Sequence, residues 1–163
     1  MTNYLNDLWS IYFHDPYDIY WDEKSYKFIS TINSVEEFVA IFYAFKELFY
    51  KGMFFIMRDH IMPRWEDEHN KNGGCFSFKV SKICLEDKFF EVCSQILGET
   101  IGISNEFSAN VNGISISPKK NYYIMRVWLS NNKFASKNNY IFSIPKFSTL
   151  MYKSHSECNE LNE

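Results

Sequence analysis

The stretch SVEEFVAIFYAFKELFYKGMFFIM, residues 34–57, decides the fold because it joins an amphipathic helix to a buried strand. Ser34 and Glu37 have the spacing of a capping box, in which two side chains satisfy backbone N–H groups of the first helical turn. Apolar residues then recur at helical spacing until Gly52 provides a stop. The apolar run that follows, residues 53–57, predicts a buried strand. We therefore expect a sheet with a helix packed against it.

Further elements outward from this stretch repeat the pattern. A second amphipathic helix is predicted over Leu85–Leu97, where Gly98 ends it. The polar segment 99–112 has no clear period and stays unassigned. Short turns join most strands, which predicts an α+β fold with an antiparallel sheet and helices on one face. The other predicted strands are 8–13, 26–31, 75–80, 113–117, 122–129, 140–144 and 147–152.

Length and composition favour one soluble domain. The chain has 163 residues and a formal net charge of −3, so an RNA contact would need a local basic patch. We expect a single domain over 1–163 with a polar, frayed tail from about residue 153. The start lacks a signal-peptide pattern and no apolar run is long enough to span a membrane, so we expect a cytoplasmic location, with the nucleus as a second one. The cysteines at 75, 84, 93 and 158 are expected to be reduced and mostly buried.

Two of the four tryptophans fall in predicted loops. Trp21 follows the first strand, and Trp65 opens the polar run WEDEHNKNGG, which reads as an exposed, mobile segment. The loops could simply fold back and bury these indoles. Alternatively, two loop indoles could face each other and sandwich a flat ligand, because base stacking on aromatic rings contributes roughly 1–3 kcal/mol per base.

An acid beside a stacking indole suits guanine. One carboxylate, that of Glu66, can accept hydrogen bonds from both N1 and N2 of the base, whereas adenine lacks this pair of donors. The acids of Glu66–His69 could instead bind a metal, but adjacent residues rarely point at one centre, and we expect no metal site and no cofactor. A solvated acidic loop is the simplest interpretation of Asp67 and Glu68.

Basic residues precede the fourth tryptophan. Lys119 and Lys120 lie in a turn, and Arg126 lies two residues before Trp128, hence on the same face of the strand. Together they could hold a phosphate chain while Trp128 contacts the base. We find no nucleophile motif or Gly-rich phosphate loop, the four histidines are scattered, and we predict no catalytic residues.

From about Trp9 to His155 the chain resembles the eukaryotic translation initiation factor 4E family, which binds the messenger RNA cap. The matching stretches are WSIYF, FISTINSVEEFVAIF, PRWEDEHNKNGG, ILGET and VWLSNN. The resemblance implies a strongly curved antiparallel sheet with two or three helices on its convex face and a cap slot on its concave side. It also implies that Trp21 and Trp65 stack 7-methylguanine, Glu66 receives the N1 and N2 hydrogens, and Trp128 touches the N7-methyl group.

Departures from the family pattern affect the phosphate contacts and the partner surface. The resemblance puts Lys119 where the family has an arginine, Ile124 where it has a lysine, and Cys75 where another basic residue is usual, so we expect a weaker phosphate grip with Arg126 as a substitute. The family's convex face binds a helix with a Y-x-x-x-x-L-φ motif. The positions that correspond to this surface are Val35, Val39, Phe90, Glu91 and Ser94, of which Val39 replaces a tryptophan and Ser94 a leucine.

The sequence therefore predicts a non-enzymatic factor that binds capped mRNA and recruits it to initiation, with an initiation scaffold or an inhibitory binding protein as its partner and no membrane contact. Three alternatives stay open. These are a cap-binding repressor that does not engage the scaffold, a metal-dependent cap or nucleotide hydrolase using Glu66, Asp67 and Glu68, and a general single-stranded RNA module.

Overall fold

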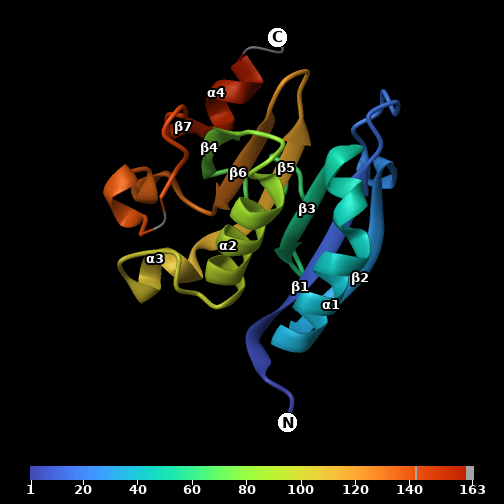
Figure 1. Cartoon of the computed structure of the whole chain (residues 1–163). Coiled ribbons are helices and arrows are strands. Elements are labelled where there is room, and N and C mark those ends of the chain that lie inside the picture. The colour runs from blue at the N-terminus through green and yellow to red at the C-terminus, as the bar shows by residue number, and fades with distance from the viewer. Residues whose placement is uncertain (142, 161–163) are drawn as a thin grey trace.

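A computed structural model describes residues 1–141 and 143–160, the last three without their side chains, and shows one seven-stranded antiparallel sheet (Figure 1). The strand order is β2-β1-β3-β5-β6-β4-β7. The strands are β1 (Tyr4–His14), β2 (Tyr26–Ser34), β3 (Met53–Arg58), β4 (Gly74–Val80), β5 (Val111–Pro118), β6 (Tyr123–Leu129) and β7 (Met151–Ser154). The α-helices are α1 (Val35–Phe45), α2 (Leu85–Leu97), α3 (Asn105–Ala109) and α4 (His155–Glu160), with 3-10 turns at Glu23–Ser25, Lys46–Tyr50, Asn132–Phe134 and Lys137–Asn139.

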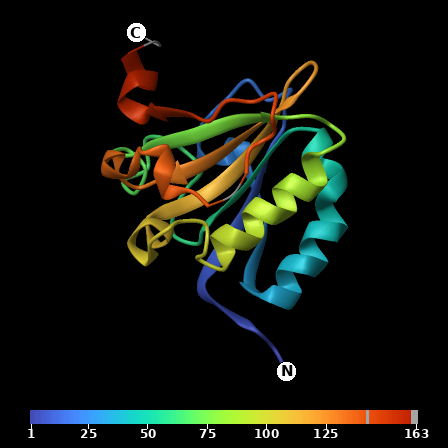
Figure 2. The same ribbon diagram turned by 60° about the vertical axis from the view of Figure 1, so that its left-hand side comes forward.

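Helices α1 and α2 lie side by side on the convex face of the sheet (Figure 2). The predicted capping interactions at the N-terminus of α1 are present. The Ser34 hydroxyl accepts the N–H of Glu37 at 3.2 Å, and the Glu37 carboxylate accepts the N–H of Asn33 at 2.6 Å. Between helices and sheet lies the main core, which is rich in phenylalanine. Phe42 packs edge to face on both Phe49 and Phe90, with ring centroids 4.9 and 5.1 Å apart.

A second, smaller group of buried residues lies on the other face of the sheet. It consists of Tyr12, Tyr26, Phe55, Met57, Ile61, Cys75 and Trp128. Because side chains alternate along each strand, this face is built from different residues than the phenylalanine core. Polar side chains on the same face of the sheet, such as those of Ser115 and Ser117, are also buried. The concave face is therefore a mixed polar and aromatic floor.

The two tryptophan loops leave opposite ends of the central strands. In the β1–β3 pair, His14 lies opposite Met53 and Trp9 lies opposite Arg58. The loop with Trp21 follows His14 at one end, whereas the loop with Trp65 follows Arg58 at the other end. Both loops fold over the concave face, where their indoles line one cavity.

Several predicted elements differ from the structure. The strand predicted over 140–144 is wrong, since residue 140 makes only an isolated bridge with Gly102, and residue 142 lies outside the described residues. The strand predicted over 147–152 is also misplaced, because β7 begins at residue 151. Segment 99–112, left unassigned, contains α3, whose N-cap is Ser104. The segment from residue 153, expected to be frayed, continues β7 to residue 154 and begins α4.

Cysteine burial also differs in part from the prediction. Cys75 and Cys93 are buried free thiols, as expected, but Cys84 is exposed at the start of α2. The side chain of Cys158 lies outside the described residues. Burial raises the pKa of the Cys93 thiol well above its usual value, so this cysteine behaves as a core residue.

Candidate functional site

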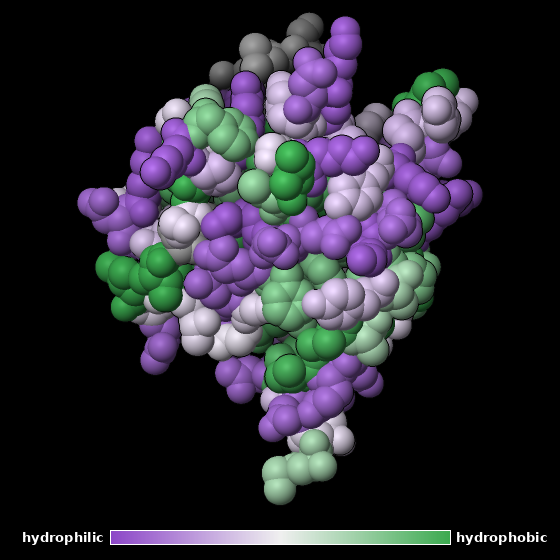
Figure 3. Space-filling model, viewed as in Figure 1, coloured by the Kyte–Doolittle hydropathy of each residue, from purple (hydrophilic) through white to green (hydrophobic). Residues whose placement is uncertain are grey.

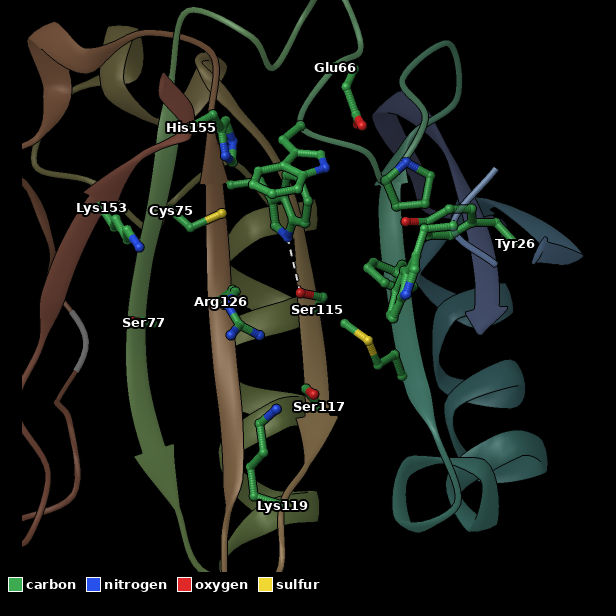
Figure 4. A pocket seen from close by; sticks show the side chains of 16 residues that line it. Tyr26, Glu66, Cys75, Ser77, Ser115, Ser117, Lys119, Arg126, Lys153 and His155 are labelled. Carbon is green, nitrogen blue, oxygen red and sulfur yellow. Dashed lines mark hydrogen bonds between the residues drawn. The ribbon is translucent and has the colours of Figure 1, made fainter. Parts of the chain in front are cut away.

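A cavity of about 670 Å³ opens on the concave face (Figure 4). It is large enough for a nucleotide-sized ligand. The strands provide its floor and the two tryptophan loops provide its walls. Its lining residues are Trp21, Tyr26, Met53, Phe55, Pro63, Trp65, Glu66, Cys75, Ser77, Ser115, Ser117, Lys119, Arg126, Trp128, Lys153 and His155.

Trp21 forms one wall and is 52% exposed. The interpretation that its loop folds back to bury it is therefore wrong. One face of the indole is nevertheless covered, because the ring of His14 stacks on it with centroids 3.8 Å apart and planes 7° apart. Tyr26 approaches the same indole edge-on at 6.3 Å. Trp21 is thus an exposed ring with an ordered support.

The loop that carries Trp65 is ordered by its own side chains, which corrects the expectation of a mobile, solvated segment. The carboxylate of Asp67 accepts hydrogen bonds from the N–H of Met62 at 3.0 Å, the N–H of His69 at 2.9 Å and the ring of His69 at 3.0 Å. Burial opposes the charge on Asp67, but these hydrogen bonds outweigh it and hold the pKa of the carboxyl below its usual value. Asp67 is therefore a structural acid, whereas Glu68 is exposed.

Asn70 ties the same loop together from inside. Its side chain is fully buried and donates to the carbonyls of Met62 at 2.9 Å and Arg64 at 2.8 Å. Its carbonyl oxygen accepts the amide of Asn112, at the start of β5, at 2.9 Å. These bonds connect the backbone on either side of Trp65 to the sheet, and they fix where the indole stands.

Glu66 projects from this loop toward the cavity (Figure 4). Its side chain is about half exposed at 52%, and one carboxylate oxygen lies 3.7 Å from Nε of Arg64. The same guanidinium lies 3.7 Å from Glu23, two residues after Trp21. Burial raises the pKa of nearby Tyr26 to about 12, with the charge of Glu66 as a second cause. The Glu66 carboxylate is thus available to accept hydrogen bonds from a ligand.

Trp128 lies on the floor and is 8% exposed. Its indole N–H donates to the Ser115 hydroxyl at 3.0 Å, the bond drawn in Figure 4. The ring of His155 lies 5.3 Å away, tilted by 40°. Burial lowers the pKa of His155 to about 4, so its imidazole is neutral at physiological pH. On β4, Cys75 lies directly opposite Trp128.

Three basic side chains line the cavity: Lys119, Arg126 and Lys153. None of the three side chains makes a hydrogen bond or ion pair with any residue in 1–141 or 143–160. Arg126 lies on the same face of β6 as Trp128, as the sequence predicts. Lys120 is exposed in the turn and the structure does not bring it to the cavity.

The structure thus brings together the predicted residues Trp21, Trp65, Glu66, Trp128, Lys119 and Arg126. The sequence argument missed Lys153 and His155, which come from β7 and the start of α4, because it treated that segment as a tail. It also missed the support that His14 gives to Trp21. The alternating pattern of β1, which makes residue 14 face the same side as residue 12, could have indicated this role.

A metal site finds no donor set here. Among the described residues, no group of three or more His, Cys, Asp and Glu side chains is arranged to hold a metal ion. No helix in the same part of the chain has the length and apolarity to cross a bilayer. What the cavity offers is two indole faces, one accessible carboxylate and three cationic groups.

The predicted partner surface lies on the convex side, over α1 and α2. Val35 and Val39 of α1 are 45% and 36% exposed, and apolar side chains gather over this region in the space-filling view (Figure 3). On α2, Ser94 donates its hydroxyl to the carbonyl of Phe90 at 2.7 Å, and Glu91 pairs with Lys88 at 2.6 Å. The small Ser94 side chain is thus directed to its own helix.

Comparison with known proteins gives a consistent result. The family model described as eukaryotic initiation factor 4E matches residues 4–163. The chain is 27% identical to eukaryotic translation initiation factor 4E of Eremothecium gossypii, over 97% of this chain and 80% of that protein. It is 26% identical to eukaryotic translation initiation factor 4E-1 of Schizosaccharomyces pombe, over 93% and 75% respectively.

Solved structures share the fold. A Caenorhabditis elegans eIF4E-3, in complex with the 4E-binding protein Mextli and a cap analog, has a TM-score of 0.82 at 19% identity, covering 98% of this chain and 96% of its own. An Ascaris suum eIF4E-3 in complex with m7G cap has a TM-score of 0.76 at 19% identity, with 95% and 92% covered. The predicted curved antiparallel sheet with helices on its convex face is therefore confirmed.

Proposed function

The chain belongs to the eukaryotic initiation factor 4E family, and from this premise we propose that its concave cavity binds the 7-methylguanosine cap of mRNA. The protein then recruits capped mRNA to translation initiation, in the cytoplasm. One observation supports this function most strongly: two loop indoles, an accessible carboxylate and three cations without acidic partners in the described chain line one cavity.

The base fits the aromatic end of the cavity. N7-methylation gives guanine a positive charge, and a cation over an indole face gains up to about 2 kcal/mol when water is excluded. Trp21 has one face free for such a ring, and Trp65 provides a second indole in the same cavity. The Glu66 carboxylate accepts the N1 and N2 hydrogens, which adenine cannot supply as a pair. Trp128 contacts the methyl substituent from the floor.

The phosphate chain fits the basic part of the cavity. Lys119 and Arg126 come from the β5–β6 hairpin and Lys153 comes from β7, so the charges surround the floor on two sides. Because none of the three forms an ion pair with a described acid, they are free to attract an anionic ligand. Arg126 then supplies the cation that Ile124 cannot provide, and Lys153 adds a cation beside Cys75, its neighbour across the β4–β7 pair.

The complexes formed by structural relatives support a partner-binding role. The Caenorhabditis elegans protein is in complex with a 4E-binding protein, and a schistosome eIF4E is in complex with m7GpppA and 4E-BP. We propose that this chain also binds an initiation scaffold or an inhibitory binding protein through α1 and α2. The exposed Val35 and Val39 give that surface its apolar character.

Isothermal titration calorimetry with 7-methyl-GTP and, separately, with GTP tests the proposal that the cavity binds the mRNA cap. We expect 7-methyl-GTP to bind at least about tenfold more tightly, since only the methylated ring is cationic. Trp65→Ala should abolish most of this preference. Equal affinities for the two nucleotides would refute cap binding and favour a general RNA module. Incubation with Mg²⁺ or Mn²⁺ should yield no hydrolysed cap analogue; product formation would indicate an enzyme instead.

A further inference from the structure

One residue outside the proposed ligand contacts holds Trp21 by two different interactions. His14 ends β1, is 1% exposed and does not line the cavity. Its ring stacks on Trp21 at 3.8 Å with an interplanar angle of 7°. Its Nε2 lies 2.8 Å from the carbonyl oxygen of Tyr20, the residue immediately before Trp21.

The hydrogen bond fixes the tautomer of this histidine. A carbonyl oxygen only accepts, so Nε2 of His14 must carry the proton that is donated to Tyr20. Nδ1 is buried and has no hydrogen-bond partner in the described structure. His14 therefore holds the Trp21 loop through its Nε2–H as well as through the face of its ring.

The support is itself rigid. His14 lies opposite Tyr26 of β2 and Met53 of β3 in the sheet. The Tyr26 ring packs edge to face on His14 at 5.3 Å and on Trp21 at 6.3 Å. With its backbone paired on both sides and its ring held by Tyr26 and by the Tyr20 carbonyl, His14 offers a fixed surface to the indole stacked on it.

We propose that His14 is a positioning residue, which holds the indole of Trp21 so that only its opposite face can receive a base. The inference rests on the proposed cap-binding function for its ligand. Holding the indole before the ligand arrives removes the entropy loss that a freely rotating side chain would suffer on binding. The stack also limits the slot to one base, since the second face of Trp21 is already occupied.

A double-mutant cycle tests this coupling, with 7-methyl-GTP as the probe and calorimetry as the measurement. His14→Ala should weaken binding about tenfold in the wild-type background, a loss typical of coupled neighbours. In a Trp21→Ala background the same change should alter affinity less than about twofold. Equal losses in both backgrounds would show that His14 acts through general stability, and would overturn the proposal.

Two further substitutions separate the ring from the hydrogen bond. His14→Phe keeps a flat ring but loses the donor, and it should retain most of the affinity. His14→Gln keeps a donor but loses the stack, and it should bind as weakly as His14→Ala. The reverse order would overturn the stacking role. Phe107→Leu, a change in the main core away from the cavity, controls for lost stability.

A ligand-free measurement keeps this inference distinct from the proposed function. In NMR spectra of the protein without nucleotide, the ring protons of His14 should carry a large upfield shift from the indole current, which Trp21→Ala removes. Unchanged His14 shifts in that variant would refute the stack. If the wild type failed to bind 7-methyl-GTP, cap binding would fall, while the NMR result would still decide the His14–Trp21 geometry.

Discussion

At the scale of single residues, two adjacent acids have different roles. Glu66 is about half exposed, 3.7 Å from one guanidinium, and directed toward the cavity. Asp67 is held by hydrogen bonds from Met62 and His69. The sequence predicts the role of Glu66 from its place beside Trp65, but it gives Asp67 only a solvated position. The hydrogen bonds to Asp67 depend on how the loop turns back, which no local pattern encodes.

Substitution of these acids should separate binding from stability. Glu66→Gln removes a charged acceptor, so we expect 7-methyl-GTP affinity to fall about tenfold or more while the melting temperature stays unchanged. Asp67→Asn should lower the free energy of unfolding by about 1–3 kcal/mol, because the N–H groups of Met62 and His69 lose an ionised partner. Calorimetric titration and denaturant unfolding of both variants check this. A loss of stability in Glu66→Gln equal to that in Asp67→Asn would contradict the assignment.

His155 should make the fold sensitive to mild acid. The unfolded chain protonates this side chain near pH 6.5, whereas burial delays protonation in the folded state to about pH 4. Between these values the unfolded state binds more protons, so stability falls as pH falls, by about 3 kcal/mol in total. The contribution of Asp67, whose pKa is lowered, is lost only at still lower pH.

Unfolding curves at pH 7 and pH 4.5 measure this effect. His155→Gln should flatten the dependence between these pH values, because the titrating group is gone. His60→Gln, a change at an exposed histidine, should keep the wild-type slope. An identical slope in His155→Gln and the wild type would contradict the role of His155.

At the scale of elements, periodic segments are predictable and context-dependent ones are not. Helix α2 is predicted at its observed bounds, Leu85–Leu97, since its apolar stripe and terminal glycine are local signals. The apolar run 140–144 fails as a strand: among its described residues Tyr140 makes an isolated bridge with Gly102 and packs on Phe107 at 5.0 Å, and no strand is formed. Ile141 of this run is 55% exposed, so a short apolar run can lie outside both sheet and core, and periodicity alone does not distinguish it from a buried strand.

The residue that caps the N-terminus of α1, Ser34, gives a prediction at the scale of elements. Ser34→Ala removes the acceptor of the Glu37 N–H and should lower the free energy of unfolding by about 1 kcal/mol. Affinity for 7-methyl-GTP should not change, since α1 lies on the opposite face of the sheet from the cavity. Ser34→Asp, which keeps an acceptor, serves as the matched control and should restore stability. Denaturant unfolding monitored by circular dichroism is the measurement.

At the scale of the whole molecule, an acidic protein concentrates unpaired positive charge in one place. The formal net charge is −3, yet Lys119, Arg126 and Lys153 line the cavity with no described acidic partner. Composition alone says only that nucleic-acid binding would need a local patch. The fold makes the patch by joining β6 to β7 through β4, a pairing between strands far apart in sequence.

The salt dependence of binding tests this distribution. Affinity for 7-methyl-GTP should fall with rising salt, because salt screens the attraction between the cations and the phosphates, and removal of one phosphate contact should make this dependence shallower. Lys153→Gln and Arg126→Glu should both weaken binding and lower the slope. Lys120→Gln, which changes an exposed lysine outside the cavity, is the matched control. An unchanged affinity in Arg126→Glu would show that Arg126 does not stand in for a basic side chain at position 124.

The two tryptophan loops start at opposite ends of the β1–β3 pair, one after His14 and the other after Arg58. Each loop is held by its own contacts: the His14 ring stacks on Trp21 in one loop, and the Asn70 amide binds backbone carbonyls in the other. Lengthening or rebuilding one loop leaves the internal bonds of the other loop in place and disturbs only what joins the two, such as the 3.7 Å ion pair between Arg64 and Glu23. The two loops can therefore be redesigned one at a time, which makes this fold a convenient starting point for engineering receptors for differently alkylated purines.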